Sequence, residues 1–414
     1  MIRFNKALLM LLMNCAPALA HGATRAATAS APLIVDQSSH VVVMEYEAWF
    51  APLAATFQGV AAMPKLQSFK MIPVGGGYDS ADPAILWQHV KWLESMGLDA
   101  TQIEVTNNVA CIFNSEAFIK RYVKNCTAGF RLGNQIIRDQ TADLYPAWTA
   151  LGTPLKLIPM MGGIDANVLY KDTDGKTALE KEIEYFGERM REYPALNVIY
   201  EGKPLMIIYL GAAQDPDPAD NPLWYRIRKF LQAHPELTDK YTFRMEAGYL
   251  DSQPGLWAKQ GTPSGPVQID PAYGFWSVVD RLNATCTAAL CPYYPTYNLA
   301  GSRVENFTAS IATAGQTGWG CPNPNTPPYC EDASLRFGDH HDYVTLNAFM
   351  NYARQLQPIF LIVDQFNEYV KPDEGFDANT DDDTEPADLW GFGALNAVRQ
   401  QIKIYRQQTV AGTP

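Results

Sequence analysis

The chain alternates between short apolar runs and longer stretches in which apolar residues recur every three or four positions. The short runs predict buried strands, and the helical period predicts amphipathic helices. The predicted strands are Val41–Glu47, Ala100–Val105, Leu155–Met161, Pro204–Leu210, Thr242–Ala247, Val267–Pro271, Phe307–Ala312 and Ile359–Phe366. The predicted helices are Pro83–Met96, Gly133–Leu151, Lys176–Glu192, Pro222–Ala233, Tyr343–Leu356 and Leu389–Arg406.

Strands that alternate with helices predict a parallel sheet, because each helix returns the chain to the start of the next strand. The fold class is therefore α/β, and eight strand candidates fit a single (β/α)8 TIM-type barrel. The run 286–339 is rich in Gly, Pro and Cys, and we interpret it as disulfide-pinned loop insertions on the barrel. The expected domains are a signal peptide over 1–20, a flexible leader over 21–39 and a barrel domain over 40–414.

The N-terminus has the pattern of an export signal. "MIRFNK" is basic, and "ALLMLLMNCAPALA" is apolar but too short to span a bilayer. Ala18 and Ala20 predict cleavage after Ala20. Cys15 stands at the spacing of a lipoprotein signal, but Asn14 is unfavourable there, so we expect a secreted or periplasmic protein without a membrane partner.

The cysteines support the same compartment. Six remain after cleavage, and an even number in an exported chain favours disulfides. The pairing that closes the shortest loops is Cys111–Cys126, Cys286–Cys291 and Cys321–Cys330. Zinc is the alternative, although the chain contains no CxxC pair.

Acidic residues recur where the predicted strands end. In "MEYEAWF", Glu45 and Glu47 share one face of the first strand. The following strands end with Glu104, Asp165, Glu246 and Asp270. Each acid alone is typical of a cap or a salt bridge, but a barrel brings its strand ends to one mouth. Aromatic residues between these acids favour a sugar site, where rings stack on the sugar and carboxylates bind hydroxyls.

The last strand leads into the most acidic segment, "LIVDQFNEYVKPDEGFDANTDDDTEP". Cleavage of a glycosidic bond needs one carboxylic acid and one ionised carboxylate, and Glu368 and Glu374 could supply them. Crowded carboxylates raise the pKa of one member, which suits the acid. The alternative is a solvated acidic loop.

Composition excludes several other partners. The net charge of −12 leaves no positive stripe for nucleic acid. "DANTDDDTE" resembles a calcium loop, but Asp382 replaces the required glycine, so an irregular calcium site and a solvated turn both stay open. The adjacent His340 and His341 do not share a helix face, and we expect neither a metal nor a cofactor.

Three segments resemble glycoside hydrolase family 99 and the related family 71. They are "VVVMEYEAWF", "GGGYDSADPAILWQHVKWLESMGLDA" and "DQFNEYVKPDEG" with the later "TEP". The resemblance spans residues 41–399 in order and approximate spacing. It implies a (β/α)8 barrel that hydrolyses α-linked sugars, typically internal α-mannosidic bonds.

The resemblance also implies roles for single residues. Glu368 takes the place of the carboxylate that acts on the substrate's own 2-hydroxyl through an anhydro-sugar intermediate, and Glu374 takes that of the general acid/base. The two glutamates stand six residues apart instead of the family's three, so that Asp373 is an alternative acid. The residues expected to line the cleft are Tyr46, Glu47, Trp49, Tyr78, Asp79, Asn367 and Tyr369.

We therefore expect an exported, monomeric glycoside hydrolase that acts on a mannan- or glucan-like polysaccharide or oligosaccharide. Glu47, Glu104 and Glu246, with Asp165, would bind substrate hydroxyls. The alternative is a glycan-binding barrel without catalysis that holds a structural calcium. A metal-dependent hydrolase is disfavoured because the chain has only 6 histidines.

Overall fold

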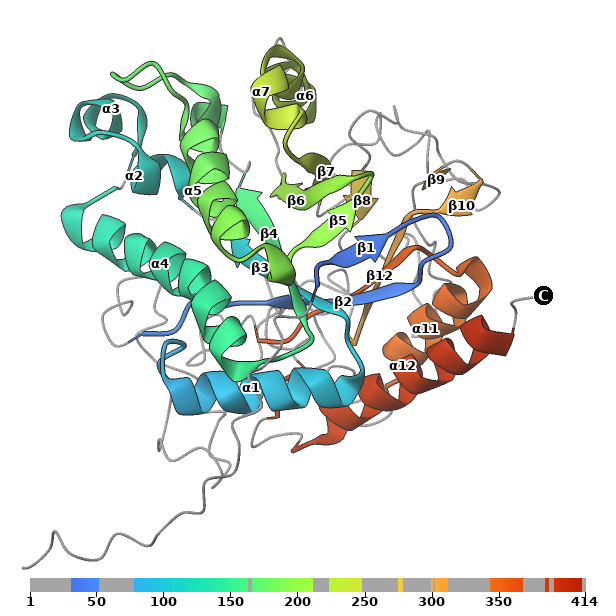
Figure 1. Cartoon of the computed structure of the whole chain (residues 1–414). Coiled ribbons are helices and arrows are strands. Elements are labelled where there is room, and N and C mark those ends of the chain that lie inside the picture. The colour runs from blue at the N-terminus through green and yellow to red at the C-terminus, as the bar shows by residue number, and fades with distance from the viewer. Residues whose placement is uncertain are drawn as a thin grey trace, which may run out of the picture.

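The computed structural model describes residues 31–51, 78–106, 108–124, 126–162, 166–210, 223–247, 275–277, 299–300, 302–311, 343–367, 384–386 and 391–411. Helices surround a central sheet, and α1 extends from α4 to α12 (Figure 1). The helices are α1 (Pro83–Met96), α2 (Val109–Phe113), α3 (Glu116–Tyr122), α4 (Ala128–Leu151), α5 (Ala178–Glu192), α6 (Leu223–Ala233), α7 (Pro235–Thr238), α11 (Val344–Leu356) and α12 (Gly393–Ala411), with 3-10 turns η3 (Ala166–Leu169) and η4 (Pro194–Leu196).

The main strands are all parallel and follow the order β11-β12-β2-β3-β4-β6-β7-β8. Their bounds are β2 (Val41–Tyr46), β3 (Ala100–Val105), β4 (Lys156–Gly162), β6 (Lys203–Tyr209), β7 (Thr242–Ala247), β8 (Phe275–Ser277), β11 (Asn306–Ser310) and β12 (Phe360–Asp364). Among the described residues, no ladder pair joins β8 to β11, although their Cα atoms come within 8 Å. The predicted α/β class with a parallel sheet is confirmed, whereas closure into a barrel stays a prediction.

Three shorter pairings extend this sheet or stand beside it. β5 (Val198–Tyr200) pairs with β6 in antiparallel fashion, and β1 (Leu33–Val35) pairs with β5 in parallel. β9 (Leu299–Ala300) and β10 (Arg303–Val304) form a separate antiparallel ribbon. Leu33–Val35 is therefore a strand within the segment that the sequence analysis assigned to a flexible leader.

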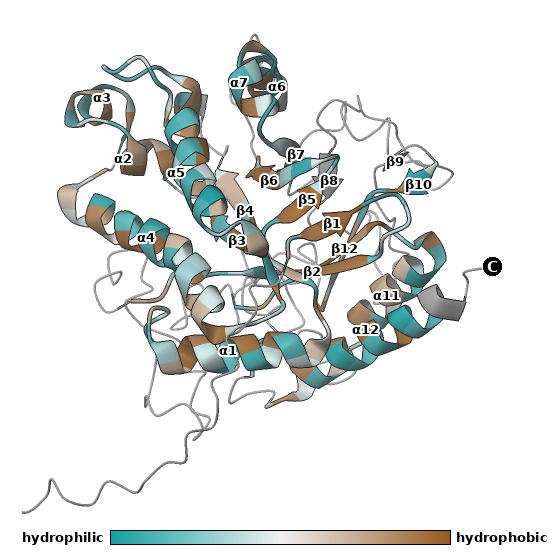
Figure 2. Ribbon diagram, viewed as in Figure 1, coloured by the Kyte–Doolittle hydropathy of each residue, from teal (hydrophilic) through white to brown (hydrophobic). Residues whose placement is uncertain are grey.

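Side chains alternate between two apolar cores along each strand. Val41 and Val43 of β2 point to the inner side, where they join Ile158, Ile207 and Ile362. The intervening residues of β2 point to the outer side and pack against the helices. Figure 2 shows the consequence: β1, β2 and β12 are largely hydrophobic, while the helices carry both kinds of residue. The inner apolar core therefore fixes the positions of the side chains that follow it at the carboxyl ends of the strands.

The inner core also contains a buried ion pair on the side where the strands begin. The Arg244 guanidinium of β7 donates to Glu305 at 2.7 and 2.9 Å and to Glu201 at 2.9 Å. Tyr200 donates its hydroxyl to Glu305 at 2.8 Å. Two carboxylates therefore balance the charge of one buried arginine.

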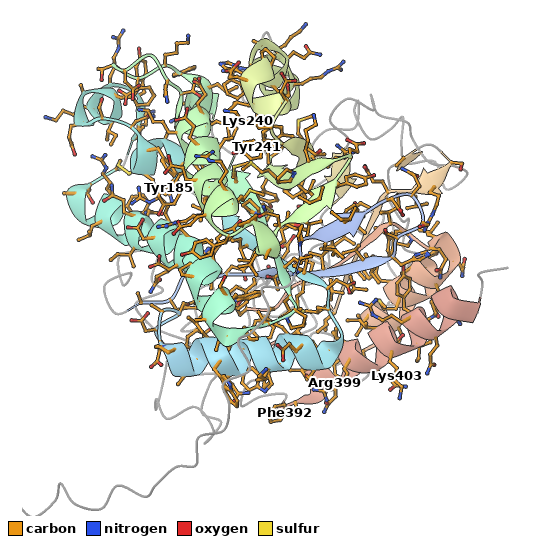
Figure 3. All side chains as sticks on the ribbon, in the orientation of Figure 1. Tyr185, Lys240, Tyr241, Phe392, Arg399 and Lys403 are labelled. Atoms are coloured by element: carbon orange, nitrogen blue, oxygen red, sulfur yellow. A yellow bond between two sulfur atoms is a disulfide. The ribbon has the colours of Figure 1, made fainter. Side chains whose placement is uncertain are left out.

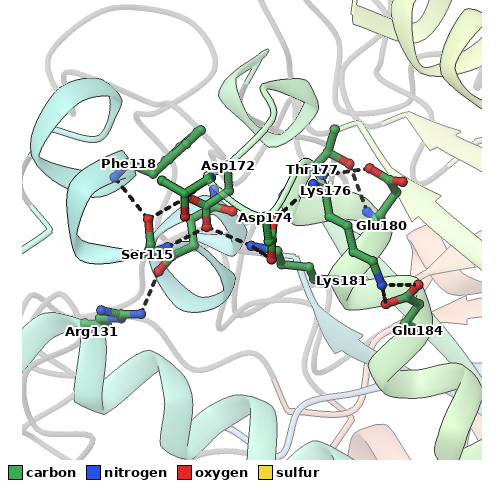
Figure 4. A network of polar contacts seen from close by, with 12 residues as sticks. Ser115, Phe118, Arg131, Asp172, Asp174, Lys176, Thr177, Glu180, Lys181 and Glu184 are labelled. Carbon is green, nitrogen blue, oxygen red and sulfur yellow. Dashed lines mark hydrogen bonds and ion pairs between the residues drawn. The ribbon is translucent and has the colours of Figure 1, made fainter.

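Polar contacts anchor α3 and α5 to each other (Figure 4). Asp172 accepts from the backbone and hydroxyl of Ser115, which caps α3, and from Lys181 of α5 at 2.7 Å. Burial would raise the pKa of Asp172, but the hydrogen bonds from Lys181 and Ser115 hold it well below its usual range. Thr177 and Glu180 form a capping box that begins α5.

Tyr241 packs closely against α5 (Figure 3), because a Cβ on Gly187 would overlap the Tyr241 hydroxyl.

Local signals set both ends of α1. Asp82 caps the helix by accepting from the Ala84 backbone, and Gly97 ends it with φ +85°. Among the helices of the described residues, none has the length and apolarity needed to cross a bilayer.

Most predicted elements are found within a few residues of their expected bounds. Pro83–Met96, Ala100–Val105 and Thr242–Ala247 match fully. The predicted strand Val267–Pro271 lies outside the described residues, and the sixth parallel strand along the chain is β8. The Cys111–Cys126 disulfide is confirmed, whereas the other two predicted pairs lie outside the described residues.

Candidate active site

Acidic side chains from several strands converge on the inner side of the sheet at its carboxyl ends. On β2, the alternation that points Val43 inward also points Glu45 inward, and Glu47 follows on the same face. None of these acids is more than 6% exposed. We call the following set the acidic cluster: Glu45, Glu47, Glu104 of β3, Glu246 of β7 and Asp364 of β12.

Polar interactions connect the members of the acidic cluster. Glu45 interacts with Asp364 and Glu47 with Glu104, each closely enough to lower the pKa of its neighbour. The Gln102 amide donates to Glu45 at 3.2 Å and also to Glu246. Gln102 therefore bridges two acids of the cluster, one from β2 and one from β7.

Burial raises the pKa values of four acids of the cluster, Glu45, Glu104, Glu246 and Asp364. Burial raises the pKa of Glu104 to about 7, against the lowering effect of hydrogen bonds from the Thr106 hydroxyl and from Glu47. Burial and the Asp364 and Glu104 charges raise the pKa of Glu246 to about 8, although Gln102 donates to it. Burial raises the pKa of Asp364 to about 6, and that of Glu45 goes well above its ordinary value through burial and then the Asp364 charge.

This arrangement limits what the acidic cluster can do. Carboxyl groups that flank a glycosidic bond stand ~5 Å apart in retaining enzymes and ~6.5–9.5 Å apart in inverting ones. Glu45 and Glu246 are both within hydrogen-bond reach of the single Gln102 amide nitrogen, so these two carboxyl groups lie close together. Acids held in this way can bind hydroxyl groups.

A second polar network lies beside the cluster, between β2 and α1. His89 of α1 meets the Tyr46 hydroxyl at Nδ1 (2.9 Å) and Glu385 Oε1 at Nε2 (2.9 Å). Tyr78 donates to Glu385 Oε2 at 3.0 Å. The Asn367 amide donates to the Tyr78 hydroxyl at 2.9 Å and to the Glu47 carbonyl at 3.0 Å, and it accepts from the Glu47 N–H at 3.0 Å. We call this set the Glu385 network.

The Glu385 network stands at the base of the acidic segment that follows β12. The Thr384 N–H donates to the carbonyls of Gln365 and Phe366 at 3.0 and 3.1 Å, and the Glu385 N–H donates to that of Phe366 at 2.9 Å. Phe366 in turn donates to the Glu45 carbonyl at 3.0 Å. The residues on either side of the segment 368–383 are therefore held together against β2.

The structure places the predicted site residues in three groups. Glu47, Glu104 and Glu246 meet in the acidic cluster, and Asn367 and Tyr78 belong to the Glu385 network. Tyr46 points away from the cluster, because it alternates with Glu45 and Glu47, and its ring packs on Phe366 and Trp148 in the outer core. Outside the described residues lie Glu368, Glu374, Asp165 and Tyr369.

Two further predicted residues hold the surroundings together. Trp49 is buried and donates its ring N–H to the Glu104 carbonyl at 3.1 Å. Asp79 is partly exposed and accepts from the Gln140 amide of α4 at 2.8 Å. The first contact ties the residues after β2 to β3, and the second ties the residues before α1 to α4.

Sequence reasoning did not assign the residues that connect these groups. Asp364 and Gln102 alternate with outward-facing apolar residues, so the strand period contained a signal for their inward position. His89 and Glu385 both lie inside the quoted family segments, but their contact joins positions 296 residues apart. No local pattern predicts such a contact.

The residues considered for metal binding in the sequence analysis lie mostly outside the described part of the chain. The calcium-like stretch 377–388 lies largely outside the described residues, as do His340 and His341. In the described part of the chain, no group of His, Cys, Asp or Glu side chains is arranged to hold a metal ion.

No protein-family model and no curated protein matches the chain. Among solved structures it is similar to the GH99 endo-alpha-mannosidase from Bacteroides thetaiotaomicron, at 12% identity, with 89% of this chain and 98% of that chain covered and a TM-score of 0.43. It is also similar to a GH29 alpha-L-fucosidase from the same organism, at 12% identity, with 91% and 77% covered and a TM-score of 0.33. The first of these two structures belongs to the family that the sequence motifs resemble.

Proposed function

We propose that the chain is a glycoside hydrolase that cleaves an α-linked glycan of the mannan or glucan type. The observation that carries the proposal is the acidic cluster, in which acids from β2, β3, β7 and β12 meet at the carboxyl ends of parallel strands. This is where α/β barrels hold their reacting groups. The motif resemblance supports the same activity.

The proposed division of labour follows from spacing and protonation. Glu368 and Glu374 are the catalytic pair, with Glu368 acting on the substrate and Glu374 as general acid/base. Glu104 and Glu246 bind sugar hydroxyls, and because their pKa values are raised to about 7 and about 8 they can do so as donors or as acceptors near neutral pH. Asn367, held in the Glu385 network, directly precedes Glu368.

Glycan cleavage by the secreted or periplasmic form tests this function. The protein is incubated with a panel of α-mannans and α-glucans, and released reducing sugar is measured for the wild type, Glu368→Gln, Glu374→Gln and Asp373→Asn. We expect Glu368→Gln to lose turnover while binding to immobilised glycan persists. Loss in Glu374→Gln but not in Asp373→Asn would assign the acid.

Three results would change the proposal. Turnover near the wild-type level in Glu368→Gln would refute the assignment of the catalytic pair. Retention on glycan without any release by the wild type would favour the glycan-binding alternative. Loss of activity in EDTA that calcium restores would add a structural ion. The matched control is Glu184→Gln on the exposed face of α5, which pairs only with Lys176 among the described residues and should leave turnover unchanged.

A further inference from the structure

The Glu385 network links helix α1 to the backbone of Glu47 through four buried side chains. His89 and Tyr78 occupy the two oxygens of Glu385 separately, at 2.9 and 3.0 Å. The Tyr78 hydroxyl then accepts from the Asn367 amide, whose two ends hold the N–H and the carbonyl of Glu47. Each of these side chains is no more than 1% exposed.

We propose that Glu385 and His89 are positioning residues that hold Asn367 and, through it, fix the main chain of Glu47 within the acidic cluster. The inference rests on the proposed function only in taking the acidic cluster as the group of acids that binds the sugar hydroxyls. Glu385 and His89 need not touch the substrate. They act through Tyr78 and Asn367.

The geometry leaves each member of the network little freedom to rotate. Tyr46 is hydrogen-bonded to Nδ1 of His89. The His89 ring is enclosed by the rings of Trp92, Phe366 and Tyr78, at centroid distances of 5.9, 5.2 and 5.1 Å. The Asn367 amide can rotate only by losing two hydrogen bonds to Glu47 at once. Rigid support of this kind is what a carboxyl group that positions substrate requires, since a displacement of ~1 Å can cost ~100-fold in rate.

Burying the network is difficult to explain by stability alone. A buried carboxylate and imidazole lose their hydration, and an apolar replacement of similar volume is often equally stable or more stable. The rings around His89 would accept such a replacement. The polar groups do, however, give a direction to the Asn367 amide, which an apolar contact cannot do.

A pair of tyrosine variants separates positioning from packing. Tyr78→Phe removes the hydroxyl that joins Glu385 to Asn367. Tyr145→Phe is the matched control, because Tyr145 of α4 is also fully buried and its hydroxyl has no hydrogen-bond partner among the described residues. We expect Tyr78→Phe to lower kcat by ~10- to 100-fold with KM changed less than ~3-fold, and Tyr145→Phe to retain both constants.

Infrared titration of the protonated carboxyl groups gives a readout that needs no turnover. The groups that face Glu104 are Thr106, Glu47 and Asp364, and the hydrogen bond from Glu47 lowers the pKa of Glu104. Tyr78→Phe should therefore raise the titration midpoint that Glu104→Gln removes. Tyr145→Phe should leave that midpoint in place.

The series ends with replacements at Glu385. Glu385→Gln retains atoms that can meet both His89 and Tyr78, so it should recover part of the rate that Glu385→Leu loses. If Tyr78→Phe equals Tyr145→Phe in kcat and in the midpoint, or if the rate falls only with the folded fraction, the positioning role is refuted. If the wild type cleaves no glycan, the proposed function fails, and the infrared midpoint then decides the positioning role by itself.

Discussion

Replacing Glu246 by glutamine should stabilise the protein at alkaline pH and not at acidic pH. An exposed glutamate ionises near 4.5, whereas Glu246 in the folded protein ionises near 8. Between these values the folded chain binds the extra proton, so the free energy of unfolding falls as pH rises through the window. Above pH 8 the buried carboxylate costs about 5 kcal/mol relative to an exposed one.

The expected gain of Glu246→Gln is smaller than that cost. The new amide oxygen still accepts from Gln102, but the new NH2 group takes the place of Oε1, which has no hydrogen-bond partner among the described residues. An unsatisfied buried donor costs about 1–3 kcal/mol. The net stabilisation at pH 9 is therefore about 3 kcal/mol, and at pH 4, where both states are protonated in the wild type, the variant is about 2 kcal/mol less stable.

Thermal unfolding at pH 4 and pH 9 measures both values. A stabilisation of this size raises Tm by roughly 3–4 °C in a chain of this length. The control is Glu184→Gln, whose side chain is 48% exposed and forms a surface pair with Lys176, so that its Tm should change little at either pH. A Tm for Glu246→Gln that falls equally at both pH values would refute the account, because packing and not charge burial would then dominate.

Three further outcomes follow from contacts described above. Cys111→Ser opens a disulfide that closes 15 residues and should cost about 3 kcal/mol in urea unfolding, which dithiothreitol should reproduce in the wild type. Gly162→Ala places a Cβ on the Thr106 carbonyl and should cost about 3 kcal/mol or more, whereas Gly129→Ala, with no heavy atom near its Cβ, should cost nothing; equal effects would contradict the packing argument. Arg244→Met leaves Glu305 without its buried cation and should cost about 3–5 kcal/mol in the same assay, and an unchanged midpoint would show that the pair contributes no net stability.

Local pattern predicted the elements well where local signals set their ends. Pro83 in the first turn and Gly97 after the last fix α1, and polar and apolar residues alternate along Thr242–Ala247. The same period assigned Glu45 and Glu47 to one face, and the structure brings that face to Glu104 and Glu246.

The site was predicted less completely because its contacts join distant segments. Tyr46 was expected to line the cleft, but the two-residue period that turns Glu45 inward turns Tyr46 outward to His89. The pairing of His89 with Glu385 depends on how α1 and the end of the acidic segment meet in space. Propensity and periodicity carry no information on that distance.

The hydrogen bonds between the residues on either side of the segment 368–383 bear on how the substrate range of this fold could change. Hydrogen bonds of Thr384 and Glu385 to Gln365 and Phe366 join the residues on either side of this segment, and these bonds do not depend on how many residues lie in between. Lengthening a loop whose flanking residues are held together adds only a small entropic penalty, about 0.6 kcal/mol for each doubling of the loop length. The six-residue spacing between Glu368 and Glu374 is therefore compatible with an unchanged sheet. Whole segments between Phe366 and Thr384 could be exchanged to alter which glycans are accepted.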